Sequence, residues 1–221
     1  PRADAPPGRQ AAEPSRIDAS VESLVPASPA PSVDAGQPIY PSDSMWALLA
    51  SAAEGSRRAE SLQGAVDFAE VIVVGRYIGL ERGAVYGRDA TAVALVKVDA
   101  VAKGRPKLGH DGLLRIEFVL VVGSGLYPER AFADLERSVP SDSALLFLFT
   151  WDRYLDMIGG GFPAFEARHD LDRTYKTIGG DGAIRVVEGR LAPSSFAEGW
   201  PTDLRAIELD TLLASIRASS N

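Results

Sequence analysis

The middle of the chain alternates apolar and polar positions with the period of β-strands. A β-branched run at residues 71–74 continues to residue 78 and predicts a buried first strand. Alternating apolar residues predict a second strand over 92–103 and, most clearly, a third over 114–122. Residues 79–87, between the first two strands, are turn-rich. The continuous apolar run at 144–149 is short enough to be a central strand rather than a helix.

Two more short strands are expected near the C-terminus, at residues 174–178 and 183–187. They flank Gly179-Gly180-Asp181-Gly182, which predicts a four-residue hairpin loop because Gly and Asp tolerate positive φ. Glu188-Gly189 then predicts a second turn before Leu191. The chain therefore has five or six strands that are joined mostly by hairpin-like turns.

Helical spacing is found at both ends of this region and once inside it. A short helix is expected around Ser61 to Asp67, and Pro128 begins an inserted helix that Pro140 stops. Another predicted helix begins at Ser42 as its cap, and its apolar face holds Met45, Trp46, Leu48 and Leu49. A closing helix is predicted with Asp210 as its cap, and its apolar face holds Leu209, Leu212, Leu213 and Ile216. Residues 151–173, with three consecutive glycines, are expected to form a long irregular excursion.

This order of elements predicts a mostly β fold, a small closed five- to six-stranded OB-like barrel with one inserted helix and terminal helices. A doubly wound fold is disfavoured because strands and helices do not alternate regularly. Phe118 and Phe147 are assigned to the inward faces of neighbouring strands. The barrel domain occupies residues 42–221, and residues 1–41, which hold nine of the fifteen prolines, are expected to be a disordered Pro/Ala-rich leader or spacer.

Composition narrows the range of partners. The formal net charge of −7 and the scattered basic residues argue against nucleic acid and against an anionic membrane surface. No run approaches the length of a transmembrane segment, and the absence of cysteine excludes disulfides and thiolate chemistry. Arginine outnumbers lysine and Asn221 is the only asparagine, which favours a bacterial origin. We expect a partner that is a protein or a glycan.

Several short stretches resemble a family of bacterial secreted proteins and lipoproteins of uncharacterised function. They are Phe68 to Arg76 (FAEVIVVGR), Val96 to Gly104, Leu145 to Leu148 (LLFL) and Tyr175 to Gly189. The resemblance spans about Leu62 to Ile216 and implies an OB-fold-type barrel similar to netrin-like modules and tissue inhibitors of metalloproteinases. It implies an extracytoplasmic, secreted or cell-envelope location, with a lipid anchor upstream of Pro1 as one form. The N-terminal cysteine through which those inhibitors act is absent here.

The candidate ligand site lies in the irregular stretch after residue 150. Trp151, Tyr154 and Phe162 form an aromatic, glycine-rich loop at the edge of the domain, where OB-type barrels bind ligands. The alternative is that Trp151 and Phe162 only cap the end of the barrel. These three residues are the predicted ligand-binding residues.

A metal site is the alternative chemistry. His169, Asp170 and Asp172 are the one cluster able to ligate a metal, although zinc sites usually use three or four ligands that converge in space. The leading hypothesis is a non-catalytic extracytoplasmic binding or interaction module that has no cofactor. The runner-up is a metal-assisted hydrolase using His169, Asp170 and Asp172, so the sequence leaves enzymatic activity open while favouring its absence.

Overall fold

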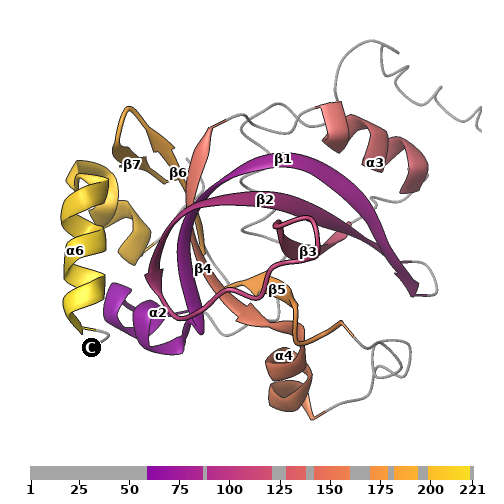
Figure 1. Ribbon diagram of the computed structural model, residues 1–221, viewed down its shortest axis with the longest axis horizontal. Helices are drawn as coiled ribbons and strands as arrows, with labels where there is room; N and C mark the ends of the chain where they lie inside the picture. The colour runs from indigo at the N-terminus through magenta and orange to yellow at the C-terminus, as the bar shows by residue number, and fades with distance from the viewer. Residues whose placement is uncertain are drawn as a thin grey trace, which may run out of the picture. The chain divides into compact units, whose positions relative to one another are not determined.

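The computed structural model describes residues 59–86, 89–120, 128–137, 142–159, 170–178, 182–193 and 199–219. The chain divides into two compact units, Pro1–Gln37 and Pro38–Asn221, and every described residue belongs to the second. These residues form a mostly β fold, a seven-stranded sheet with helices packed against it (Figure 1), as the sequence predicts at this level. The predicted leader and the predicted helix after Ser42 lie outside the described residues.

The seven strands follow one another with helices after the third and fourth. They are β1 (Val71–Tyr86), β2 (Asp89–Lys103), β3 (Leu114–Leu120), β4 (Ser143–Thr150), β5 (Thr174–Thr177), β6 (Ala183–Val187) and β7 (Arg190–Ala192). The expected turn-rich segment 79–87 is wrong, because β1 remains paired with β2 through residue 86. Register shifts between Tyr77 and Gly79, and between Arg82 and Val85, mark irregularities or bulges that let a long strand bend without losing its partner.

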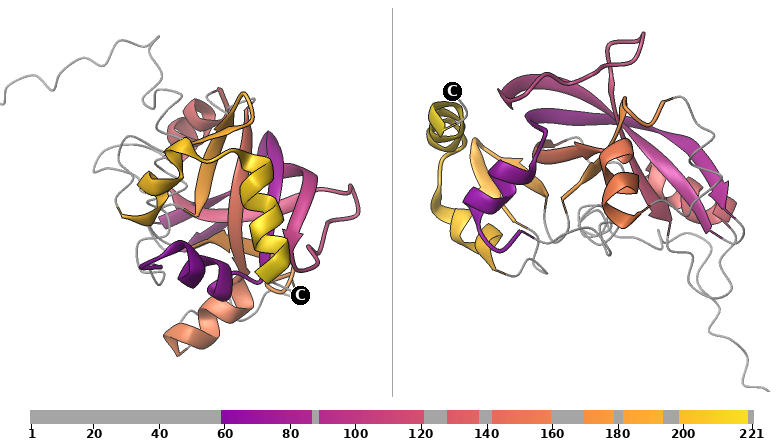
Figure 2. Two further views of the ribbon diagram at one scale, coloured as in Figure 1. Left: turned by 90° about the vertical axis from the view of Figure 1, so that its left-hand side faces the viewer. Right: turned by 90° about the horizontal axis from the view of Figure 1, so that it is seen from below.

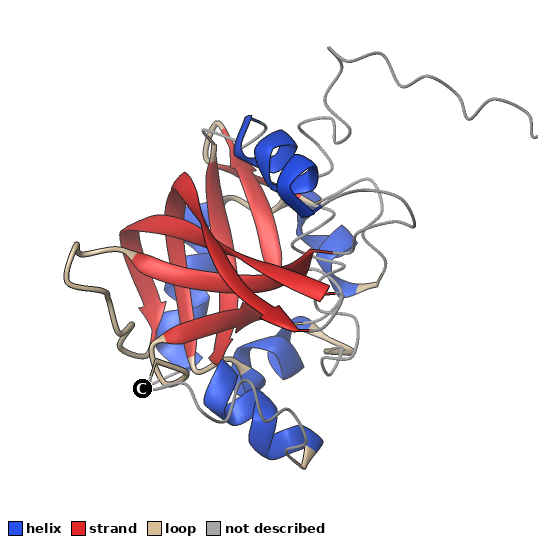
Figure 3. Ribbon diagram, turned by 90° about the vertical axis from the view of Figure 1, so that its right-hand side faces the viewer, coloured by secondary structure: helices blue, strands red, loops and turns tan. Residues whose placement is uncertain are grey.

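The strand pairings form a circuit that begins and ends at β1. β1 pairs with β2, β2 with β3 and β4 with β5 in the antiparallel sense, while β3 and β5 are parallel. β4 also pairs with β1, from Val71 opposite Leu148 to Arg76 opposite Ser143. The order β1-β2-β3-β5-β4 therefore returns to β1, and Figure 3 shows the strongly curved strands that make these pairings.

The predicted hairpin between β5 and β6 is wrong. Leu148 pairs with Val71 and with Thr177, and Leu146 pairs with Val73 and with Ala183. Because β1 occupies one edge of β4, β5 and β6 must follow each other along the other edge. Around Phe147, Ile178 donates to its carbonyl at 3.0 Å and Phe147 donates to the carbonyl of Gly182 at 2.7 Å. β5 and β6 thus run in the same direction along β4 instead of forming a hairpin, and residues 179–181 lie outside the described residues.

β4 is buried on both faces and separates two hydrophobic cores. Its alternate residues Ala144, Leu146 and Leu148 belong to a first core with residues of β1, β2, β3 and β5. Leu145, Phe147 and Phe149 belong to a second core on the other face. Phe118 lies in the first core and Phe147 in the second. Both side chains are buried, as predicted, but their strands are not neighbours, since β5 lies between β3 and β4, and the two rings face different cores.

Helices cover these cores from different sides. The second core packs against α2 (Leu62–Phe68), the 3-10 helix η1 (Trp200–Ala206) and α6 (Leu209–Ser219), and Figure 2 shows α2 and α6 over the strands. Ser61 caps α2, accepting from the Gly64 amide at 3.0 Å. The predicted closing helix is present, with Asp210 inside its first turn rather than at its cap. α3 (Pro128–Arg137) contributes Phe132 and Leu135 to the first core.

Glycines of the family-like stretches have structural roles. A Cβ on Gly75 would lie 2.6 Å from a Val96 methyl group and 2.8 Å from the Lys97 carbonyl oxygen. Gly104 has φ +73° and lies against the carbonyl of Glu70. The preceding Lys103 donates to the Val66 carbonyl near the end of α2 at 2.6 Å. The Lys-Gly pair thus joins the end of β2 to the α2–β1 junction.

Candidate functional site

Polar side chains follow the face of β3 and β5 that is opposite the first core. Leu114, Ile116 and Tyr175 point into that core, so Arg115, Glu117, Thr174 and Lys176 lie on the other face by strand alternation. Arg115 is paired in register with Thr174, and Glu117 and Lys176 follow two residues later. We call these four residues the polar stripe. One end of it is open and the other end is covered.

The open end is a pocket of about 320 Å³. It is lined by Arg115 and Thr174 of the stripe, by Gly109, His110 and Asp111 of the β2–β3 connection, and by Asp170 and Arg173 just before β5. Asp111 accepts from Arg115 at 2.9 and 3.0 Å, in a bidentate pair. Thr174 donates to the Asp170 carbonyl at 3.0 Å. The polar groups of Arg115, Asp111 and Thr174 in the pocket wall are therefore held in place by hydrogen bonds within the wall itself.

Ion pairs set the charge of this pocket. The hydrogen bond from Arg115 lowers the pKa of Asp111 to about 2, with help from the Leu113 amide, and the same pair raises the pKa of Arg115. Beside it, Lys107 donates to Asp172 at 2.7 Å and lowers the pKa of that carboxyl. Arg173 lies 3.9 Å from Asp172, and 60% of its side chain is exposed. Its guanidinium is thus accessible from solvent.

The covered end holds a buried charged cluster. Glu117 is 1% exposed and Lys176 is 5% exposed. Thr91 of β2 donates its hydroxyl to Glu117 at 2.5 Å and is also 3.2 Å from the Ala84 carbonyl. Nζ of Lys176 lies 4.0 Å from the Trp151 ring centroid and 4.4 Å from that of Tyr154. A cation between two aromatic rings therefore closes the stripe.

Both rings come from a helix, so the expected loop at the start of 151–173 is wrong. α4 (Trp151–Ile158) begins immediately after β4, where Thr150 caps it, and ends at Gly159 with φ +78°. Trp151 is 2% exposed and packs with Leu155 and Leu171, while Tyr154 is partly buried against them. Phe162, the third predicted ligand-binding residue, lies outside the described residues. The helix places Trp151 and Tyr154 together over Lys176.

Burial of Lys176 predicts a rise of stability with pH. Desolvation lowers its pKa from 10.5 to about 8, while the charge of Glu117 opposes this shift. Between these two values the unfolded chain binds more protons, so the folded state gains stability as pH rises. We expect the free energy of unfolding to be about 2 kcal/mol higher at pH 9.5 than at pH 7, measured by urea titration.

Lys176→Met is the matched control, because it removes the amine and keeps an unbranched side chain. Its free energy of unfolding is expected to lack this rise. Burial raises the pKa of Tyr77, so ionisation of this tyrosine in the unfolded chain lowers the stability of the fold only above about pH 10. Tyr77 therefore does not disturb the comparison between pH 7 and pH 9.5. An equal rise in both proteins would show that another group titrates.

Only part of the alternative metal site lies among the described residues. His169 lies outside the described residues, Asp170 is exposed, and Asp172 faces Lys107. In the part of the chain that the structure describes, no three His, Cys, Asp or Glu side chains are grouped as metal ligands. Asp170 does lie in one pocket with His110 and Asp111, a grouping that the sequence analysis did not anticipate.

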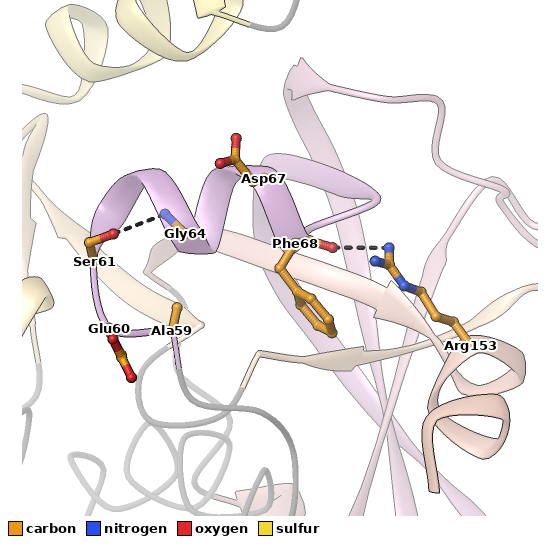
Figure 4. Close-up of a pocket in the computed structure, with 7 residues that line it drawn as sticks. All are labelled: Ala59, Glu60, Ser61, Gly64, Asp67, Phe68 and Arg153. Carbon is orange, nitrogen blue, oxygen red and sulfur yellow. Dashed lines mark hydrogen bonds between the residues drawn. The ribbon is translucent and has the colours of Figure 1, made fainter. Parts of the chain in front are cut away.

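A second hollow of about 490 Å³ lies between α2 and α4 (Figure 4). Its lining includes Glu60, Asp67, Phe68 and Arg153. Arg153 donates to the Phe68 carbonyl at 3.0 Å, and its guanidinium lies 4.6 Å from the centre of the Phe68 ring. Arg153 therefore anchors α4 to the end of α2 through this hydrogen bond and this stacking contact.

No family model, no curated protein and no solved structure matches this chain in the three comparisons. No helix among the described residues is both long and apolar enough to cross a membrane. The candidate site therefore rests on the geometry of the chain itself.

Proposed function

We propose that the chain is a non-catalytic, extracytoplasmic binding module that binds a glycan in the open pocket of the polar stripe. The observation that carries this is the pocket of about 320 Å³ on the outer face of β3 and β5, whose lining holds donors on Arg115 and Arg173 and acceptors on Asp111 and Asp170. Each sugar hydroxyl both donates and accepts a hydrogen bond, so a wall of this kind matches a polyhydroxylated ligand.

An OB-like closed barrel is the fold that we propose for this module. The support is the circuit of pairings β1-β2-β3-β5-β4-β1 among five of the seven strands, with α3 inserted between β3 and β4. OB-type barrels bind oligonucleotides and oligosaccharides on the face of their second and third strands, beside the adjoining loops. The pocket includes Arg115 of β3 and, just before β5, Asp170 and Arg173 of the β4–β5 connection, which is one of the two loops that OB-type barrels use. Its lining by the β2–β3 connection departs from that pattern.

Charge favours the sugar over the nucleic acid. The chain has a net charge of −7, and two aspartates, Asp111 and Asp170, line the pocket together with its two arginines, Arg115 and Arg173. A phosphate backbone needs a clustered basic surface, whereas a neutral sugar does not. The extracytoplasmic location is supported by the family resemblance, and fractionation of cells that express the complete gene tests it.

The proposal is tested by screening the full chain on an array of neutral and acidic oligosaccharides, followed by calorimetry with the best hit. We expect Arg173→Ala to weaken binding at least tenfold, because it removes an exposed guanidinium from the pocket wall. Arg105→Ala is the matched control, an exposed arginine of the β2–β3 connection that does not line the pocket. Equal losses in both variants, or no hit on the array, would contradict the proposal.

A further inference from the structure

Lysine is rare in this chain, and one of its four lysines occupies an unusual place. Lys103 donates to the Val66 carbonyl, Lys107 is paired with Asp172, and Lys97 is exposed. Lys176 is 5% exposed, beneath Trp151 and Tyr154. Its amine is the one buried amino group among the described side chains.

Packing alone gives no reason for an amine at this position. Placing Lys176 and Glu117 in the protein interior removes two charges from water, and such pairs are often replaced by apolar residues without loss of stability. A methionine at position 176 would fill the space against the two rings and carry no desolvation cost. The buried amine is therefore a candidate for chemistry.

The open pocket and this amine lie at the two ends of the polar stripe. Thr174 lines the pocket and precedes Lys176 by two residues on the same face of β5. Arg115 stands in the same relation to Glu117 on β3. Two residues of a strand span about 7 Å, and this is the backbone spacing between the pocket residues of the stripe and the buried pair Glu117 and Lys176.

We propose that Lys176 is a covalent attachment site for a small carbonyl compound, an aldehyde or a ketone, that enters through the open pocket. The neutral Nζ attacks the carbonyl carbon and gives a carbinolamine, whose oxygen takes up the nitrogen proton. Loss of water then leaves an imine, with a carbon–nitrogen double bond in place of the carbonyl. The step needs no oxidant or reductant, and it does not depend on the glycan proposal.

The surroundings of Lys176 favour its neutral, nucleophilic form. Burial lowers its pKa to about 8, against 10.5 for an exposed lysine. The charged or titratable groups that face it are Glu117 on β3 and Tyr154 on α4. At pH 7 the neutral fraction is then about 300-fold larger than for an ordinary lysine. Desolvated lysines of this kind are the ones that form imines with carbonyl substrates.

The test is reductive trapping of the full chain with acetaldehyde and cyanoborohydride at pH 7, with peptide mapping by mass spectrometry. We expect initial modification of Lys176 at least tenfold faster than that of the exposed Lys97, and a rate that levels off above pH 8. Glu117→Gln should speed trapping about threefold, because the Glu117 charge holds the Lys176 pKa up. Lys176→Met should leave the other three sites unchanged.

Internal comparison within the wild-type chain keeps the test independent of how well the variants fold. Lys176 modified no faster than Lys97, or a Lys176 rate that climbs to pH 10 like the others, would overturn the proposal. Slower trapping in a folded Glu117→Gln variant would also contradict it.

Discussion

Phe147→Ala is expected to lower the free energy of unfolding by about 3–5 kcal/mol. Phe147 is 0% exposed in the second core, and its ring meets Trp200 edge-on with centroids 5.4 Å apart. Removal of the ring leaves a cavity between β4 and η1 that rigid neighbours fill only in part. Chemical denaturation of the full chain measures the loss.

Ile78→Ala is the control for this substitution. Ile78 lies on β1, which is paired with β4, but it is 53% exposed. We expect a change within about 0.5 kcal/mol, as for ordinary surface positions. Similar midpoints for the wild type and Phe147→Ala would mean that η1 does not pack on β4.

Gly104→Ala is expected to destabilise the fold by about 3 kcal/mol. Gly104 has φ +73°, and an added Cβ would overlap the main-chain carbonyl of Glu70. Glu70 cannot retreat freely, because its carboxylate accepts from the Thr150 amide at 2.6 Å and from its hydroxyl at 3.0 Å. The substitution should therefore disturb the α2–β1 junction and the start of α4 together.

Gly112→Ala separates the cost of a left-handed backbone from the cost of steric overlap by the added Cβ. Gly112 has φ +75°, and a Cβ there would meet nothing within 4 Å. It should cost only the left-handed strain, about 1 kcal/mol. Thermal melts of the two variants side by side give the difference, and equal shifts would contradict the close approach of Gly104 to Glu70.

Local pattern predicted most of the strands because their burial is strictly periodic. β3 alternates Leu114, Ile116 and Phe118 with polar neighbours, and β4 is apolar throughout, as a strand buried on both faces must be. The order of the strands depends on distant pairing, which no local pattern encodes. The glycines before Gly182 suit a hairpin, and only the partner strand β4 shows that β5 and β6 run on in one direction.

The site was harder to predict than the fold. Glu117 and Lys176 occupy polar positions of alternating strands, which normally face water. Lys176 is buried beneath Trp151 and Tyr154 of α4, and Glu117 lies against Thr91 of β2. The sequence does not predict α4, because its buried apolar stripe is only Trp151 and Leu155. The available signal was Thr150 as a helix cap with Asp152 in the first turn. The sequence indicates Trp151 and Tyr154 only through their aromatic rings, and their proximity to Lys176 is visible only in the structure.

Amide chemical shifts show directly whether the open pocket of the polar stripe is the ligand site. The ¹⁵N-labelled chain is titrated with the glycan that binds best on the array. We expect the largest shifts at Gly109, Asp111, Arg115, Arg173 and Thr174. Shifts centred instead on Gly64, Phe68 and Arg153, in the hollow between α2 and α4, or no shifts with any glycan, would contradict it.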